Sequence, residues 1–250
     1  MRYERRFMFD VVIAGGEVLD GSGAQAVRAD VGVRGDRIAA VGDLADAQAG
    51  TRIDACGLVV CPGFIDVHSH SDTYLLIEPD AESKIRQGVT TEIVGNCGAS
   101  AAPLHTPYKL PSDWRDKTYP DSWSTVAQYR TLLEAAAPAL NVVLLIGHNT
   151  LRAGAMGYED RPPTKDETAL MARRLDRALE EGGRGFSSGL AYPPGIYART
   201  DEVVELARVA ARHGAIYASH MRSESGRLLE AIDEALAVGR GAGVRVQVSH

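Results

Sequence analysis

Apolar runs and glycine turns divide the 250-residue chain into two regions with different spacing. Residues 9–60 hold several short apolar or alternating runs separated by turns such as Gly15-Gly16. Short strands at regular intervals are typical of a small all-β unit. From residue 58 onward, apolar runs alternate with longer helical patterns, which indicates βα units and a parallel sheet. We therefore predict a small β-sandwich subdomain over residues 1–60 and an α/β domain over residues 61–250.

The second region predicts six strands and five helices. Six βα strands in succession suit a (β/α)8 TIM-type barrel, although a complete barrel has eight. We therefore expect about six of its strands here, with the barrel incomplete at the C-terminus. Long loops are expected at 103–120 and 153–163, and such loops are more often functional than ornamental. The strands are expected at 58–67, 89–95, 141–147, 184–190, 214–219 and 244–249, and the helices at 80–87, 122–137, 167–181, 201–212 and 225–241.

Two of these helices carry a clear apolar face. The spacing of the apolar residues is helical in both segments and supports a helix in each. The residues concerned are Val203, Leu206, Ala207 and Ala210 in the first, and Leu228, Leu229, Ile232 and Leu236 in the second.

Charge, apolar runs and cysteine content limit the kinds of partner and compartment that fit this protein. The formal net charge is -6, which argues against nucleic acid because such partners are bound by basic surfaces. No apolar run is long enough to span a membrane, and the charged first ten residues do not form a signal peptide. Three cysteines do not make a disulfide framework. We expect a cytoplasmic protein without nucleic-acid or membrane partners; the sequence leaves its oligomeric state open.

Histidines and a cysteine follow the predicted strands at their carboxyl ends. His68 and His70 end the strand 58–67, where residues two apart share a face. Cys97 follows the second strand, His220 ends the fifth and His250 ends the sixth. In a parallel barrel these ends converge on one face. Because thiolate and imidazole together favour zinc over magnesium or calcium, we predict a zinc site there.

Other polar residues receive structural interpretations. Cys56 and Cys61 lie at the amino end of the first strand and are expected to pack in the interior. His148 follows the third strand and is expected to border the pocket rather than bind metal. His213, at a helix end, is expected to be structural. Asp66 shares a face with His68 if the strand is regular, so it is a candidate to support the metal ligands.

Five motifs together resemble the amidohydrolase superfamily, and three of them its D-aminoacylase branch, the N-acyl-D-amino-acid deacylases. The two superfamily motifs are Ala14-Gly15-Gly16-x-Val18-x-Asp20-Gly21 and Pro62-Gly63-Phe64-Ile65-Asp66-Val67-His68-Ser69-His70. The branch motifs are residues 88–98 around Cys97, residues 185–195 around Tyr192, and Ser219-His220-Met221-Arg222-Ser223-Glu224. Many superfamily members bridge their metals with a carboxylated lysine, whereas this branch uses a cysteine.

The resemblance implies roles for individual residues. Cys97, His220 and His250 would hold a tightly bound zinc. His68 and His70 would form a second, weaker position that Cys97 can bridge. Tyr192 would lie near the scissile acyl group or the substrate carboxylate, or it would merely fix its proline-rich loop. The general-base aspartate is expected beyond His250, so no catalytic residue is expected within the chain.

The predicted reaction is zinc-dependent hydrolysis of the amide bond of N-acyl-D-amino acids to a carboxylate and a free D-amino acid. The D configuration comes from the resemblance alone. One alternative is a cyclic amidohydrolase of the hydantoinase or dihydroorotase type, against which Cys97 and the lack of lysine in residues 183–190 count. The other is a metal-binding fragment without activity. The isolated 250-residue chain is expected to have little activity and aggregation-prone sheet edges.

Overall fold

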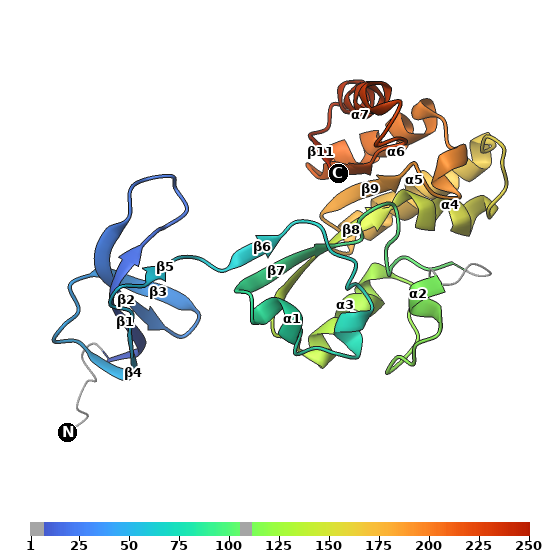
Figure 1. Ribbon diagram of the computed structural model, residues 1–250. Coiled ribbons are helices and arrows are strands. Elements are labelled where there is room, and N and C mark those ends of the chain that lie inside the picture. Colours follow the sequence, from blue (N-terminus) through green and yellow to red (C-terminus); the bar gives the residue numbers. More distant parts are fainter. Residues whose placement is uncertain (1–7, 106–111) are drawn as a thin grey trace. The chain divides into compact units, whose positions relative to one another are not determined.

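The chain divides into two compact units at Gly63 and Phe64 (Figure 1). The computed structural model describes residues 8–105 and 112–250. All the predicted ligand residues belong to the second unit, Phe64–His250.

The first unit is one mixed β-sheet. Its five strands are β1 (Met8–Val18), β2 (Val27–Arg34), β3 (Arg37–Gly42), β4 (Gln48–Asp54) and β5 (Val59–Val60). The order is β3-β2-β1-β4, with β5 also paired to β1. β2 is antiparallel to β1 and to β3, whereas β4 and β5 run parallel to β1.

The prediction of a sandwich is wrong for the described residues, because a sandwich has two sheets and this unit has one. Regularly spaced short strands reveal how many strands exist but not how they are shared among sheets. Cys56 and Cys61 are also exposed rather than packed in the interior.

The predicted strand 58–67 is divided between the two units. Val59–Val60 pairs with β1, whereas β6 (Phe64–Asp66) pairs with β7 of the other sheet. Pro62 lies between them; it has no backbone N–H and cannot donate to a continuous ladder. The apolar run is therefore two short strands.

The second unit is built on a six-stranded parallel sheet. The strand order is β11-β10-β9-β8-β7-β6, so each strand lies beside its neighbour in sequence. The described residues supply six of the eight strands of the predicted barrel, and the sheet has edges at β6 and β11. The remaining strands are β7 (Val89–Val94), β8 (Asn141–Gly147), β9 (Gly185–Gly189), β10 (Ile216–His220) and β11 (Val246–Val248).

Helices connect the parallel strands and pack side by side. α6 contacts both α5 and α7, and α4 contacts α5. The α6 residues Val203, Leu206 and Ala210 are buried, as their spacing predicts. Together with side chains of the strands they form one large core. The helices are α1 (Glu82–Ile85), α2 (Ser112–Arg115), α3 (Val126–Ala136), α4 (His148–Met156), α5 (Lys165–Glu180), α6 (Thr200–Arg212) and α7 (Leu228–Ala242), with short 3-10 turns η1 (Tyr74–Leu76) and η2 (Gly195–Tyr197).

The two predicted loops contain helices. α4 occupies 148–156 and reaches into the predicted loop 153–163. Its first residue follows β8 directly, so the sequence offers no loop between strand and helix to mark its start. α2 lies within the predicted loop 103–120; residues 106–111 of that loop fall outside the described part of the chain.

The predicted helix is present as α7, but its leucines do not form the buried face. Leu228, Leu229 and Leu236 are exposed, Leu229 by 75%. The buried residues are instead Ala231, Ala235, Val238 and Gly239. Small side chains let α7 approach its neighbours closely, since a Cβ at Gly239 would lie 2.4 Å from Val246 Cγ2. Close packing by small residues therefore decides which face is buried.

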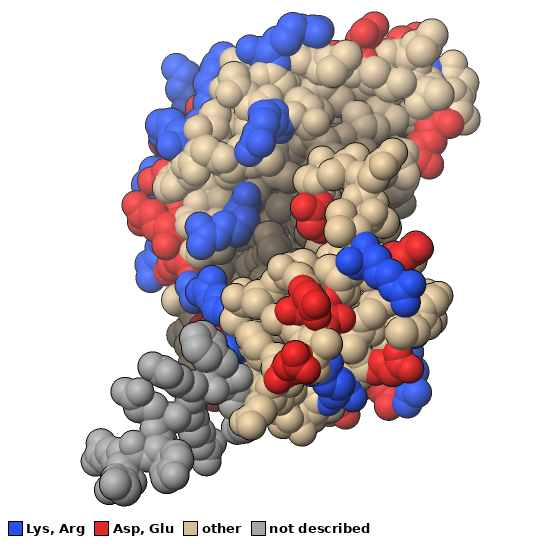
Figure 2. Space-filling model, turned by 90° about the vertical axis from the view of Figure 1, so that its left-hand side faces the viewer, with Lys and Arg blue, Asp and Glu red and all other residues tan. Residues whose placement is uncertain are grey.

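The face of the molecule drawn in Figure 2 carries side chains of both charges. Lys and Arg side chains occur on this face together with Asp and Glu, and neither sign covers it alone. None of the helices in the described ranges combines the length and apolar character needed to cross a bilayer.

The start of α5 yields a prediction about acid stability. Thr164 and Glu167 form a capping box, and the Glu167 carboxylate also accepts two hydrogen bonds from Arg161 at 2.7 and 2.8 Å. Arg161 and the Thr164 amide lower the pKa of Glu167 to about 2. The ionised form stabilises the fold above the unfolded pKa, so this stability is lost as pH falls from about 4.5 towards 2.

We expect Glu167→Gln to lower the free energy of unfolding by about 1–2 kcal/mol at pH 7, with a smaller difference at pH 3. Urea denaturation at both pH values measures it. Glu180→Gln, at the exposed other end of α5, is the control. An equal difference at both pH values would contradict the assignment.

Candidate metal centre

The carboxyl ends of four strands converge on one cluster of side chains. His68 and His70 follow β6, and Cys97 follows β7. His220 is the last residue of β10, and His250 lies two residues beyond β11. Parallel strands place these ends on the same edge of the sheet. The structure therefore brings together all five residues that the sequence pattern singled out.

The sulfur of Cys97 lies among the imidazoles. Cys97 Sγ is 3.3 Å from His68 Nε2, 3.4 Å from His220 Nδ1 and 3.8 Å from His250 Nε2. Two triads can each present their ligand atoms to one ion, with the atoms of each triad within 4.8 Å of one another. One is His68, His70 and Cys97, and the other is Cys97, His220 and His250. Cys97 belongs to both.

These separations fit zinc. Bonds of about 2.3 Å to sulfur and 2.0 Å to nitrogen at a tetrahedral angle place the two ligand atoms about 3.5 Å apart. The observed separations from Cys97 Sγ to the three nitrogens lie on both sides of that value. A thiolate with imidazoles is also a donor set that zinc prefers. The residues present therefore fit the ion.

The charge states favour a cation as well. Burial raises the pKa of the Cys97 thiol to about 11, and the charge of Glu224 adds to this shift. Burial also lowers the pKa of His68 and of His220, with neighbouring histidines adding to it. At His68 and His220 the neutral imidazole, which can donate a lone pair to a metal, is therefore favoured, and a divalent cation would favour the Cys97 thiolate.

The segment that carries His68 and His70 is a bend and not a strand. β6 ends at Asp66, so alternation along a strand does not explain why the two rings are close. Their centroids are 5.3 Å apart with the planes nearly perpendicular. Asp66 fixes the start of the bend, because its Oδ1 accepts a hydrogen bond of 3.1 Å from the His68 backbone N–H. Asp66 thus supports the segment through its backbone.

An ionic cluster of Lys84, Asp66 and Glu92 supports the segment that carries His68 and His70. Lys84 Nζ lies 2.5 Å from Asp66 Oδ2 and 3.2 Å from Oε1 of Glu92, whose side chain is fully buried. Ser71 Oγ donates to the other oxygen of Glu92. Lys84 therefore compensates a buried carboxylate that would otherwise be costly.

Cys97 stands in a tight turn that only small residues permit. Its own φ is +53°, in the left-handed region that costs a side chain about 1–2 kcal/mol. Ser187 fixes the turn from β9: its Oγ donates to Gly95 O at 2.5 Å and accepts from Gly98 N at 3.1 Å. A Cβ at Gly98 would lie 2.2 Å from Asn149 Oδ1. The backbone packing thus determines where the sulfur points.

Asn149 connects this turn to the loop of Tyr192. Its Nδ2 donates to Gly189 O at 3.1 Å and to Tyr192 O at 3.3 Å. Gly189 in turn leaves no room beside the cysteine, since a Cβ there would lie 2.1 Å from Cys97 O. Asn149 follows β8 in sequence without any spacing signal that would have revealed it.

Tyr192 lies beside the cluster. Its ring centroid is 4.6 Å from that of His220, and 49% of the residue is exposed. Burial, then the charges of Cys97 and Glu224, raise the pKa of its hydroxyl. A half-exposed hydroxyl that keeps its proton is available to a bound molecule.

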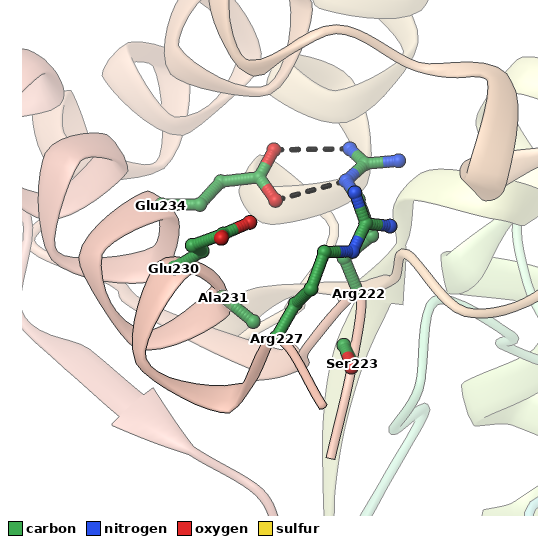
Figure 3. Close-up of a pocket in the computed structure, with 6 residues that line it drawn as sticks. All are labelled: Arg222, Ser223, Arg227, Glu230, Ala231 and Glu234. Atoms are coloured by element: carbon green, nitrogen blue, oxygen red, sulfur yellow. Dashed lines mark hydrogen bonds and ion pairs between the residues drawn. The ribbon is translucent and has the colours of Figure 1, made fainter. Parts of the chain in front are cut away.

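A cavity of about 230 Å³ lies at the start of α7 (Figure 3). Arg222, two residues after His220, lines it and forms a bidentate ion pair with Glu234 at 2.9 and 3.0 Å. Arg222 also donates to the carbonyls of Ile196 and Ala198. It therefore anchors the far end of the Tyr192 loop.

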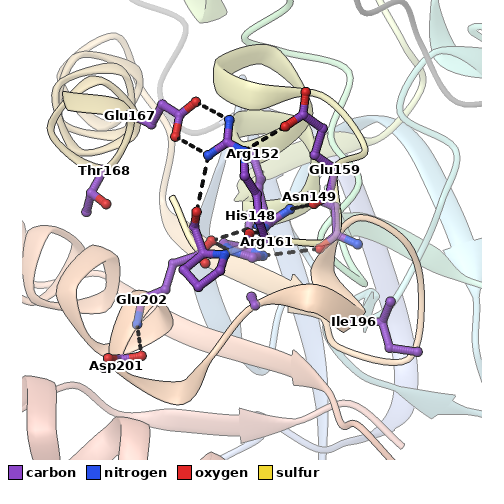
Figure 4. Close-up of polar contacts among 12 residues, drawn as sticks. His148, Asn149, Arg152, Glu159, Arg161, Glu167, Thr168, Ile196, Asp201 and Glu202 are labelled. Carbon is purple, nitrogen blue, oxygen red and sulfur yellow. Dashed lines mark hydrogen bonds and ion pairs between the residues drawn. The ribbon is translucent and has the colours of Figure 1, made fainter. Parts of the chain in front are cut away.

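His148 does not border the pocket. It is fully buried, and its Nε2 lies 2.8 Å from Glu202 Oε1, which Arg152 Nε also contacts at 3.1 Å (Figure 4). The interpretation of His213 as a helix-end residue agrees with its contact to Asp176 Oδ1 at 2.9 Å.

The chain belongs to the amidohydrolase family, whose model matches residues 51–240. Within this family it is similar to D-aminoacylase of Alcaligenes xylosoxydans xylosoxydans, with 46% identity over 243 residues, 97% of this chain and 50% of the relative. The chain thus spans about half the length of the curated relatives it matches.

Solved structures of related enzymes are also similar to this chain. The crystal structure of D-aminoacylase matches with a TM-score of 0.91 at 46% identity, over 97% of this chain and 51% of that one. N-acyl-D-glutamate deacylase from Bordetella bronchiseptica, solved with zinc and a phosphonate inhibitor, matches with a TM-score of 0.90 at 42% identity, over 96% and 50%. An L-hydantoinase from Arthrobacter aurescens has a TM-score of 0.65 at 21% identity, over 96% and 52%, and shares the fold.

The packing around Cys97 predicts unequal effects of two glycine substitutions. Gly98 and Gly214 both have positive φ, +74° and +65°, but a Cβ at Gly214 would meet nothing within 4 Å. We expect Gly214→Ala to cost about 1–2 kcal/mol of stability. Gly98→Ala adds the clash with Asn149 and should cost about 3 kcal/mol more.

Urea denaturation of both variants measures this difference. Zinc titration should show weakened binding only for Gly98→Ala, because only that substitution displaces the cysteine. Equal losses of stability would mean that the close approach around the turn is not a constraint.

Proposed function

We propose that the protein is a zinc-dependent hydrolase of the amide bond in N-acyl-D-amino acids, which releases a carboxylate and a free D-amino acid. The observation that carries this proposal is the position of Cys97 Sγ, 3.3–3.8 Å from nitrogens of His68, His220 and His250. The similarity to relatives named D-aminoacylase, N-acyl-D-glutamate deacylase and N-acyl-D-aspartate deacylase supports the substrate class.

In this proposal Cys97, His220 and His250 hold one zinc tightly, and His68 and His70 form a weaker second position bridged by Cys97. A binuclear centre in D-aminoacylase, activated by one metal and attenuated by a second, supports two positions. Bound zinc would polarise the acyl carbonyl and lower the pKa of a water molecule to about 7.

Tyr192 is proposed to bind the substrate. Its backbone is fixed by Asn149, and Arg222 holds the end of its loop, so little ordering is needed when a ligand arrives. The protonated hydroxyl can donate a hydrogen bond to the acyl oxygen or to the substrate carboxylate. Donation to the acyl oxygen would contribute most in the transition state.

The general base of the reaction is proposed to lie outside these 250 residues. Among the described residues, Glu224 is a carboxylate at the cluster, and its Oε1 lies against His250 Nδ1 at 2.5 Å. Asp66 is engaged by Lys84 and by the His68 backbone. A carboxylate free to take a proton from water is therefore expected from elsewhere in the protein.

A cyclic amidohydrolase is the second candidate. The fold shared with hydantoinases permits it, although a fold at 21% identity does not carry an activity. Cys97 at the centre of the ligands favours the deacylase. The third candidate is a protein that binds metal without activity, and the turnover experiment distinguishes it.

Metal analysis tests the ligand set. We expect about one zinc per chain, lost in Cys97→Ala because the sulfur belongs to both triads. Cys56→Ala is the matched control, since Cys56 is exposed and belongs to the other unit. Zinc retained by Cys97→Ala would refute the assignment.

Turnover tests the substrate class. The assay uses the protein at the length of its relatives, with N-acetyl-D-amino acids, their L enantiomers and hydantoins as substrates. We expect hydrolysis of the D compounds, and about a 10²-fold loss of kcat in Tyr192→Phe if the hydroxyl stabilises the transition state. Preferred turnover of hydantoins would establish the second candidate, and zinc binding without turnover the third.

A further inference from the structure

One carboxylate lies behind two of the proposed zinc ligands. Glu224 Oε1 is 2.5 Å from His250 Nδ1 and 3.5 Å from His220 Nε2. Each imidazole turns its other nitrogen to Cys97 Sγ, which is Nε2 in His250 and Nδ1 in His220. The two histidines thus use opposite ring nitrogens toward the sulfur, and Glu224 faces the remaining one of each.

We infer that Glu224 is a positioning residue that fixes the tautomers of His220 and His250 and strengthens both as metal ligands. The inference rests on the proposed zinc site. A neutral imidazole carries its proton on one nitrogen and a lone pair on the other. An ionised carboxylate accepts that proton in a hydrogen bond, so the lone pair remains on the nitrogen that faces the metal.

The two histidines need different tautomers. His250 must be protonated on Nδ1 to leave Nε2 free, whereas His220 must be protonated on Nε2 to leave Nδ1 free. The same Glu224 oxygen is hydrogen-bonded to His250 Nδ1 and lies 3.5 Å from His220 Nε2, so its charge favours a proton on each of these nitrogens. The negative charge also raises the basicity of each ligand nitrogen and, with the Cys97 thiolate, offsets the charge of a divalent ion.

The position of Glu224 is not explained by packing. Its side chain is 46% exposed, and it lies between β10 and α7 rather than within either element. Its carboxylate contacts His250 at 2.5 Å and His220 at 3.5 Å. A substitution should therefore change metal binding while leaving the fold nearly unaffected.

The position of Glu224 in the sequence fits this role. Glu224 follows His220 by four residues, in the segment that joins β10 to α7. The turn of that segment brings the carboxylate back over the end of β10, where it also reaches His250 from the neighbouring strand.

The experiment measures zinc affinity by competition with a chromophoric chelator, for the protein and for Glu224→Ala, Glu224→Gln and Glu230→Gln. We expect a 10- to 100-fold weaker affinity in Glu224→Ala. Glu224→Gln keeps an acceptor without the charge and should lie between. Glu230→Gln makes the same change of charge at an exposed position on α7 and should bind zinc within about twofold of the parent protein.

A second measurement separates positioning from a general loss of charge. Imidazole nitrogen chemical shifts of the metal-free protein should show His250 protonated on Nδ1, and a shift toward the Nε2–H form in Glu224→Ala. Melting temperatures should stay within a few degrees. A parent protein that binds no zinc would refute the proposed function. Zinc binding and tautomers unchanged in Glu224→Ala would refute this inference alone.

Discussion

The close approach of backbone around Cys97 is the constraint on which the centre depends. The turn after β7 fits between the ends of β8 and β9 only because glycines stand where a Cβ would collide with a carbonyl or an amide. Cys97 itself keeps a left-handed φ of +53° in that turn. Such strain persists only where the surroundings over-determine the conformation. Hydrogen bonds from Ser187 and Asn149 hold the backbone in this conformation, and the sulfur therefore points at the imidazoles.

Charge balance follows from this geometry. Burial raises the pKa of the Cys97 thiol to about 11, so the thiol keeps its proton at pH 7 when no cation is bound. A divalent cation changes that balance, and the same burial that raises the thiol pKa then strengthens every bond to the ion. The buried Glu92 shows the same rule with a protein cation, since Lys84 compensates it within 3.2 Å. Lys84 thus compensates the carboxylates on one side of the His68 segment, and a bound cation would compensate the thiolate on the other.

The sequence predicts which side chains gather at the candidate metal centre, because their signal is local. Each ligand follows an apolar run at its carboxyl end, and parallel strands align such ends whatever the details of packing. That reasoning places His68 and His70 in the cluster even though β6 ends at Asp66 and the expected alternation does not apply.

The remaining features depend on contacts that no local pattern reveals. Asn149 donates hydrogen bonds to the carbonyls of residues that lie 40 and 43 positions later in the sequence. Lys84 and Glu92 form a pair only once α1 packs beside β7. In α7 the leucines have the stronger apolar pattern, yet close approach by alanine and glycine decides the buried face. Strand pairing likewise divides the run 58–67, because Val59 finds its partner in β1 and Phe64 in β7.

In the proposed reaction, selectivity for one enantiomer would have to arise outside the metal ligands. Imidazole and thiolate ligands contact an ion and not the α-carbon of a substrate, so the cluster alone accepts an acyl group on either enantiomer. Discrimination needs a further fixed point that the side chain of the wrong enantiomer would meet. The Tyr192 loop has the required rigidity, because Asn149 holds one end and Arg222 the other. Its ring lies against His220, so a substrate bound at the proposed metal would lie beside it.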